Sequence, residues 1–130
     1  MSSKSFWMTL LASVSGMFGC TLEGDNYHRV DVDEFEQALA DSTIFRLDVR
    51  SKDEYEESHI AGAVHIDVML DSFKKKALAT FPAESTIAVY CRSGKRSQKA
   101  ASILVKNHYK VIELKTGFNG WTEVGKPVEN

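Results

Sequence analysis

The sequence contains little cysteine, and its pattern excludes two common uses of that residue. Cys20 and Cys91 are the only cysteines among 130 residues. They are too few for a disulfide framework, and neither lies in a Cys-x-x-Cys or Cys/His cluster with the spacing of a zinc site. The four histidines are scattered as well, so we expect no metal ion and no other cofactor. Each cysteine therefore needs an explanation of its own.

The chain also lacks an excess of charge of either sign. Sixteen Lys and Arg residues stand against eighteen Asp and Glu residues, which gives a formal net charge of −2. A protein that binds nucleic acid usually needs a basic face to neutralise phosphates, so we expect no nucleic-acid partner. A length of 130 residues allows one domain and no second core, and we expect this domain to be a monomer.

Long hydrophobic runs are absent apart from one near the N-terminus. Residues 6–19 carry no charged side chain, and they follow Lys4. Fourteen helical residues would span about 21 Å, whereas the hydrocarbon core of a bilayer is about 30 Å thick. We therefore interpret residues 1–19 as a signal peptide rather than a membrane span. The alternative is an apolar helix that packs on the domain.

The apolar run ends at Met17-Phe18-Gly19-Cys20, which resembles the lipobox of bacterial lipoproteins. The resemblance implies that Cys20 is lipidated and becomes the mature N-terminus, with residues 20–26 as a short polar tether. The expected location is the bacterial cell envelope, where the protein would be a membrane-anchored lipoprotein facing the periplasm. A soluble exported protein is the alternative.

Beyond the tether, apolar runs of strand length alternate with amphipathic stretches of helix length. The expected strands are 27–30, 44–49, 63–66, 87–90 and 111–114, and the expected helices are 33–40, 52–58, 68–78 and 97–108. Such alternation is typical of parallel strands joined by crossover helices. It predicts that residues 27–130 form a three-layer α/β/α domain with a mainly parallel sheet of about five strands.

A short cationic loop follows the expected strand 87–90. Cys91 opens it, and Arg92, Lys95 and Arg96 follow at the start of the next expected helix. Backbone N–H groups at a helix N-terminus already present positive potential, so cations are unfavourable there unless an anion occupies the loop. Gly94 can adopt a positive φ, which turns successive N–H groups inward as a nest for a negative atom.

The same field lowers the pKa of a thiol at its centre and produces a nucleophilic thiolate. The alternative is that Cys91 is a small buried hydrophobic residue at the end of a strand, but the cationic loop favours the reactive thiolate. Asp48 and Arg50 lie at the end of another expected strand. We expect them to pair with each other or with loop residues and to support the site, and direct contact with substrate is the alternative.

Three segments of the chain, in order, resemble the signatures of the rhodanese-like domains. They are residues 47–63, residues 89–97 with the sequence VYCRSGKRS, and residues 114–128. The second resembles the active-site loop of that family, with Cys91 in the place of the cysteine that forms a persulfide. Ser58, Ala61 and Thr116 depart from residues that are usual in the family, which are glycine, proline and glycine.

The resemblance implies a rhodanese-like fold and a sulfurtransferase that moves sulfane sulfur from an anionic donor, such as thiosulfate, to a thiol or cyanide. The implied catalytic residue is Cys91, and the implied substrate-binding residues are Arg92, Ser93, Gly94, Lys95 and Arg96. Related phosphatases and arsenate reductases carry Cys-x5-Arg, and the shorter Cys-x4-Arg spacing here disfavours their chemistry. A noncatalytic persulfide carrier or protein-docking module remains an alternative, followed by a small phosphatase or arsenate reductase.

Overall fold

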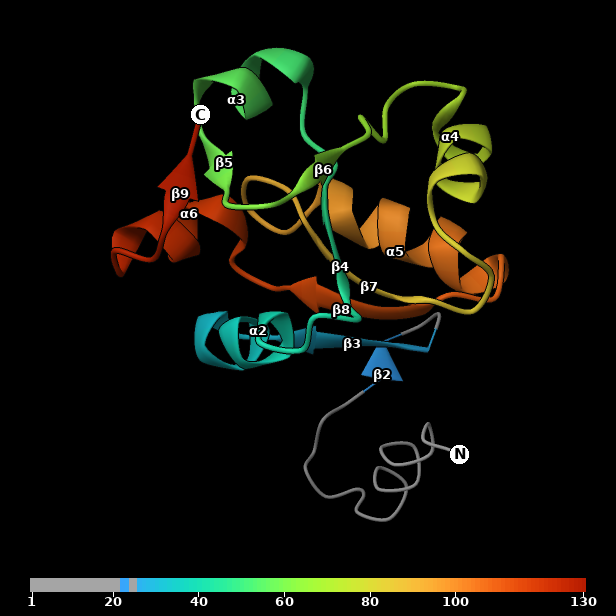
Figure 1. Cartoon of the computed structure of the whole chain (residues 1–130), viewed down its shortest axis with the longest axis horizontal. Helices are drawn as coiled ribbons and strands as arrows, with labels where there is room; N and C mark the ends of the chain where they lie inside the picture. The colour runs from blue at the N-terminus through green and yellow to red at the C-terminus, as the bar shows by residue number, and fades with distance from the viewer. Residues whose placement is uncertain (1–21, 24–25) are drawn as a thin grey trace.

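The computed structural model describes residues 22–23 and 26–130 of the chain (Figure 1). The expected signal peptide, residues 1–19, and the expected lipidation residue Cys20 lie outside these described residues. Within residues 22–23 and 26–130, no helix is long and apolar enough to cross a membrane. Part of the expected tether belongs to the sheet, because Leu22–Glu23 forms strand β2, which pairs antiparallel with the next strand.

The main sheet has six strands in the order β2-β3-β8-β7-β4-β6. After β2, its strands are β3 (Tyr27–Val30), β4 (Phe45–Asp48), β6 (Val64–His65), β7 (Thr86–Tyr90) and β8 (Lys110–Leu114). These five strands pair in parallel with their neighbours, and β2 is the antiparallel edge. The prediction of a mainly parallel sheet of about five strands is therefore confirmed.

Four expected helices are present, one of them displaced along the chain. They are α2 (Val32–Leu39), α3 (Lys52–Glu57), α4 (Phe73–Thr80) and α5 (Arg96–Lys106). The helix expected over 68–78 begins only at Phe73, because the chain before it is held in turns. The side chain of Asp67 accepts a hydrogen bond from the backbone N–H of Met69, and the N–H of Phe73 donates to the carbonyl of Leu70. Local bonding of this kind competes with the helix.

Three further elements near the C-terminus and the middle of the chain were not expected. They are helix α6 (Gly117–Glu123) and a small antiparallel sheet of β5 (His59–Ile60) and β9 (Val128–Glu129). Two glycines within α6 give its sequence a low helix propensity, and the two strands are too short to show a period. The departures at Ser58 and Thr116 do not strain the backbone, because their φ values are −176° and −93°.

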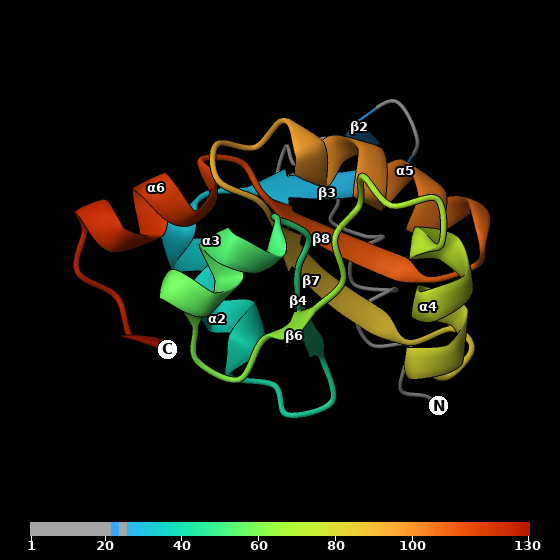
Figure 2. The same cartoon turned by 90° about the horizontal axis from the view of Figure 1, so that it is seen from above.

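Helices cover both faces of the sheet and create two cores. One core contains residues of α4 and α5, and the other contains residues of α2 and α6. Figure 1 shows α4 and α5 together at the right and α2 and α6 at the left, and Figure 2 shows the same separation from above. Strand β7 lies between them, with Ile87 and Val89 in the first core and Ala88 and Tyr90 in the second, as the alternation of a strand requires.

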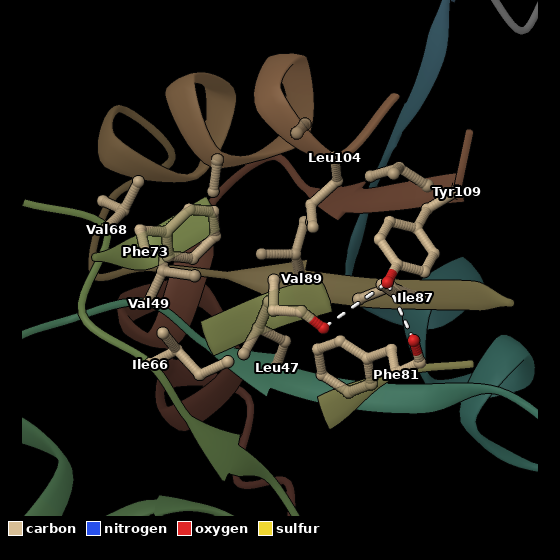
Figure 3. Close-up of a cluster of buried hydrophobic side chains, with 14 of the residues drawn as sticks. Leu47, Val49, Ile66, Val68, Phe73, Phe81, Ile87, Val89, Leu104 and Tyr109 are labelled. Atoms are coloured by element: carbon tan, nitrogen blue, oxygen red, sulfur yellow. Dashed lines mark hydrogen bonds between the residues drawn. The ribbon is translucent and has the colours of Figure 1, made fainter. Parts of the chain in front are cut away.

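The first core fixes the middle of the sheet beneath α4 and α5 (Figure 3). Leu47 and Val89 lie on neighbouring strands and are fully buried, and Leu104 of α5 packs in the same cluster. The hydroxyl of Tyr109 donates to the carbonyl of Phe81 at 2.8 Å, which satisfies this buried polar group. With both its faces packed, β7 holds the residue that follows it, Cys91, in a fixed position at the carboxyl edge of the sheet.

Candidate active site

Cys91 lies where β7 ends and the loop to α5 begins. Figures 1 and 2 show this loop beside α3 and α6. The cysteine is 1% exposed, and the backbone N–H of Gly94 donates a hydrogen bond to its Sγ at 3.2 Å. Burial raises the pKa of the Cys91 thiol, but the hydrogen bonds around its Sγ, among them those from the backbone N–H groups of Ser97, Gly94 and Ser93, outweigh it, and the pKa lies below its ordinary value. Such a loop can hold a sulfur anion.

Glycine is the residue type that fits position 94 in the loop. Its φ is +94°, a conformation that side chains rarely adopt, and a Cβ there would collide with the carbonyl oxygen of Lys115. The carbonyl of Gly94 accepts hydrogen bonds from Arg29 at 3.1 Å and from Gln98 at 2.8 Å. Gly94 is therefore held through its carbonyl on one side, while its N–H donates to the sulfur.

Helix α6 braces the loop from outside. The N–H of Phe118 donates to the carbonyl of Cys91 at 2.8 Å, and the N–H of Asn119 donates to that of Arg92 at 3.0 Å. Gly117 makes this approach possible, because its φ is +65° and a Cβ on it would collide with the carbonyl of Arg92. The two loop carbonyls therefore point at α6, and the opposite sides of the same peptides are available to the sulfur.

The guanidinium groups of Arg92 and Arg96 share one carboxylate, that of Glu54 on α3. Arg92 Nε lies 2.9 Å from Glu54 Oε2, and Arg96 lies 2.8 Å from Oε1 and 3.0 Å from Oε2. Arg96 contributes most to holding the pKa of Glu54 well below its ordinary value. Glu54 was not predicted as a site residue. Its only signal was the Ser-x-x-Glu pattern with Ser51, which forms a capping box at the start of α3.

The remaining predicted loop residues lie on the surface of the site. Ser93 and Lys95 are exposed, and the N–H of Ser93 contributes to the hydrogen bonding of Cys91. Together with Arg92 and Arg96, Lys95 makes the rim of the loop cationic, while the sulfur lies inside it. The structure therefore brings all six residues of the Cys91–Arg96 segment together around one sulfur atom.

Asp48 and Arg50 pair with each other behind the loop. Arg50 donates to both carboxylate oxygens of Asp48 at 2.8 to 3.1 Å, and both residues are at most 1% exposed. The hydroxyl of Tyr90 also donates to Asp48, at 2.6 Å, and the Arg50 guanidinium lies 4.2 Å from the centre of the Phe118 ring. Tyr90 precedes Cys91 and Phe118 braces it, so the pair supports the site from the side away from solvent.

Three polar residues behind the sulfur were also not predicted. Ser97 Oγ lies 3.4 Å from Cys91 Sγ, and its hydroxyl donates to Glu113 Oε2 at 2.5 Å. Glu113, on β8, pairs with Arg29 of β3 at 2.6 Å. The pattern of apolar residues placed Glu113 within an expected strand, but it gave no sign that the carboxylate points into the protein. Among residues 22–23 and 26–130, no group of three or more potential metal ligands is present.

The chain is similar to known proteins of one family. The family model described as "Rhodanese-like domain" matches residues 31–124. The thiosulfate sulfurtransferase GlpE of Coxiella burnetii is 41% identical over 76 residues, which cover 57% of this chain and 67% of that protein. YrkF of Bacillus subtilis, named as a sulfur carrier protein, is 36% identical over 95 residues, which cover 72% of this chain.

The relatives differ from this chain in length. The chain spans 50% of YrkF and 20% of another curated relative. The rhodanese-like domain of the Anabaena protein Alr3790, a solved structure, superposes with a TM-score of 0.71 at 25% identity, covering 78% of each chain. The match therefore concerns one domain, and it includes the whole loop from Cys91 to Arg96.

Proposed function

Because this chain belongs to the rhodanese-like domain family, we propose that it is a sulfurtransferase that uses a persulfide on Cys91. The donor is a small sulfur anion such as thiosulfate, and the acceptor is a thiol or cyanide. The observation that supports this most is the position of the Cys91 sulfur, which is buried inside a loop whose backbone N–H groups point toward it. The thiosulfate sulfurtransferase among the relatives supports the choice of donor.

In the first step, the Cys91 thiolate attacks the outer sulfur of thiosulfate. A bond forms between Cys91 Sγ and that sulfur, and the S–S bond of thiosulfate breaks with its electron pair leaving on sulfite. The total charge of −3 on thiolate and thiosulfate is conserved as the persulfide anion and sulfite. The N–H groups of the loop stabilise the negative sulfur that results.

In the second step, the acceptor attacks the outer sulfur of the persulfide. With cyanide, the electron pair of the S–S bond returns to Cys91 Sγ, and thiocyanate leaves. Cys91 is a thiolate again and no proton is consumed. The enzyme alternates between its free form and its persulfide form, and sulfite leaves before the acceptor reacts. This order predicts ping-pong kinetics.

The donor dianion must compete with Glu54 for Arg92 and Arg96. Glu54 already bonds both guanidinium groups at 2.8 to 3.0 Å, so the donor gains less from them than from unpaired cations. Arg92 and Lys95 are exposed at the rim, where they raise the local concentration of anions. The loop N–H groups are therefore the main contribution to holding the reacting sulfur.

The test is sulfur loading of the full chain with thiosulfate, followed by mass spectrometry of its peptides. The peptide that contains Cys91 should gain one sulfur, about 32 Da, and thiocyanate should form when cyanide is added. Cys91→Ser should abolish both, while Cys20→Ser, which removes the other cysteine of the chain, should load like the wild type. Full turnover by Cys91→Ser would overturn the proposal.

A persulfide carrier is the second candidate function, and the relative YrkF, named as a sulfur carrier protein, favours it. The deep burial of Cys91, at 1% exposure, also suits a protein that keeps sulfur until a specific acceptor arrives. A carrier would load one sulfur on Cys91 but would not turn over with cyanide. The same experiment therefore separates the two functions.

For the N-terminal segment, we propose that residues 1–19 are a signal peptide and that Cys20 carries a lipid anchor. The support is the sequence Met17-Phe18-Gly19-Cys20 after an uncharged run. Two or more acyl chains exceed the marginal membrane binding of a single chain, so the domain would stay at a membrane of the cell envelope.

A further inference from the structure

Glu113 is a buried carboxylate that the sulfur chemistry above does not use. Its side chain is fully buried on β8, in the centre of the sheet. Oε1 accepts from Arg29 Nε at 2.6 Å, and Oε2 accepts from the hydroxyl of Ser97 at 2.5 Å. A charge in such a place requires partners, and here one of the partners also contacts the reactive sulfur.

Ser97 has a single hydroxyl hydrogen and two neighbours that can accept it. Glu113 Oε2 is 2.5 Å from Ser97 Oγ, whereas Cys91 Sγ is 3.4 Å away. The shorter contact to a carboxylate directs the hydrogen to Glu113, because hydrogen bonds to ionised acceptors are shorter and stronger than those to neutral ones. The sulfur then faces a lone pair of Ser97 Oγ, which accepts well from an S–H group and repels a thiolate.

A thiolate on Cys91 therefore requires a change in this network. Either the Ser97 hydrogen turns to the sulfur, and Glu113 loses that hydrogen bond, or the thiolate remains next to an oxygen lone pair. Both outcomes disfavour the free thiolate. A persulfide has no such conflict, because its Sγ is bonded to two atoms and uncharged, and the negative charge lies on the outer sulfur, about 2 Å from Sγ.

We propose that Glu113, acting through the hydroxyl of Ser97, is a positioning residue that disfavours the free thiolate of Cys91 and so keeps the domain in its sulfur-loaded form. The inference rests on the sulfur transfer proposed above. It also sets the rate of discharge. When an acceptor removes the outer sulfur, Cys91 Sγ leaves as a thiolate, and a thiol with a higher pKa leaves more slowly.

Other charges around the sulfur are balanced separately from this network. The charged groups around the loop include Arg96 of α5, Glu54 of α3, Arg29 of β3, Glu113 of β8, Asp48 of β4 with its partner Arg50, and Arg92, Lys95 and Asp67 of the connecting segments. Glu54 pairs with Arg92 and Arg96, and Arg29 pairs with Glu113. Within this set, Glu113 is bonded to the hydroxyl that contacts Cys91 Sγ.

The test is the pH dependence of iodoacetamide alkylation at Cys91 in the full chain, followed by mass spectrometry of the Cys91 peptide so that Cys20 does not interfere. Glu113→Gln can donate an amide N–H to Ser97 Oγ, which frees the hydroxyl for the sulfur. The pKa of the Cys91 thiol should fall by about one unit. Cyanide should then discharge the loaded variant about three times faster than the wild type.

Ser97→Ala supplies the matched background, because it removes the hydroxyl through which Glu113 acts. In that background, Glu113→Gln should leave the pKa of Cys91 nearly unchanged, so the two substitutions are non-additive. If Glu113→Gln does not fold by circular dichroism, Arg29→Gln with Glu113→Gln removes both members of the buried pair. Gln98 still holds the carbonyl of Gly94 in that variant, and the same fall in pKa is expected.

An unchanged or raised pKa of Cys91 in the folded Glu113 variant would overturn the inference, as would an equal shift with and without Ser97. Alkylation needs no sulfur donor, so this result is independent of catalysis. A wild-type chain that fails to take up sulfur from thiosulfate would instead overturn the proposed function.

Discussion

Replacing Gly94 by alanine should destabilise the active-site loop, and the same substitution at Gly125 provides the matched control. Gly94 and Gly125 both have positive φ, at +94° and +77°. A Cβ on Gly94 would collide with the carbonyl oxygen of Lys115, whereas a Cβ on Gly125 would meet nothing within 4 Å. The two substitutions therefore share the backbone penalty and differ in the collision.

The expected losses follow from these two contributions. A non-glycine residue in the left-handed region costs about 1 to 2 kcal/mol, which is the whole effect expected for Gly125→Ala. Crowding a packed site costs a further amount of about 1 to 3 kcal/mol, so Gly94→Ala should lose about 2 to 5 kcal/mol of unfolding free energy. If the loop moves to relieve the collision, the N–H of Gly94 leaves Cys91 Sγ, from which it is now 3.2 Å.

Two measurements separate these outcomes. Urea unfolding gives the loss of stability for both variants, and the pH profile of Cys91 alkylation reports the hydrogen bond to the sulfur. Gly94→Ala should lose more stability than Gly125→Ala, or raise the pKa of the Cys91 thiol, or both. If Gly94→Ala matched Gly125→Ala in stability and kept the wild-type alkylation profile, the account of this loop as a rigid cradle would be wrong.

Three more predictions concern Glu54, Tyr90 and Cys20. The pKa of Glu54 lies below its ordinary value of 4.5 in the folded state, so the stability that its charge contributes is present above pH 4.5 and is lost as the pH falls. Glu54→Gln should therefore flatten the decline in unfolding free energy at acid pH. The same substitution releases Arg92 and Arg96 and should lower the KM for thiosulfate. Tyr90→Phe removes a buried hydrogen bond to Asp48 and another from the N–H of Ile60, and should cost about 1.5 to 3 kcal/mol in urea unfolding. Tyr55→Phe should cost about 1 kcal/mol, because its hydroxyl donates only to the neutral carbonyl of Ala63. Expressed in bacteria with labelled palmitate, the chain should take up label and Cys20→Ala should not; equal label in both would refute lipidation at Cys20.

The sequence predicted the parts of the fold that a periodic pattern encodes. Strands β3, β4, β7 and β8 and the long helix α5 have apolar residues at regular spacing, because each contributes buried residues to the cores. Helix α6 and the β5–β9 pair have no such pattern. They form because tertiary contacts hold them: the N–H groups of Phe118 and Asn119 bond the loop, and His59 and Ile60 pair with residues far along the chain.

The candidate site was predictable only where its residues are adjacent in sequence. The segment from Cys91 to Arg96 is contiguous, so its charge and its glycine could be interpreted together. Glu54 lies 38 positions before its partner Arg92 in the loop. Glu113 lies 16 positions after its partner Ser97 in α5. A carboxylate within an amphipathic helix or a strand is usually a solvated residue, and no local pattern distinguishes these two from the other acidic residues of the chain.

The two glutamates change the electrostatic argument that the loop sequence suggested. Three cations at a helix N-terminus are unfavourable without an anion, and the protein supplies that anion itself, since Glu54 lies between Arg92 and Arg96. Glu113 similarly balances Arg29 behind the sulfur. Glu54 offsets only one of these two arginines, so the rim of the unliganded loop, with Lys95, remains cationic. What distinguishes the sulfur position within it is the set of backbone N–H groups. A donor that binds there must exchange with Glu54, whereas the transferred sulfur atom needs only the N–H groups, so the site favours the persulfide over the donor that forms it.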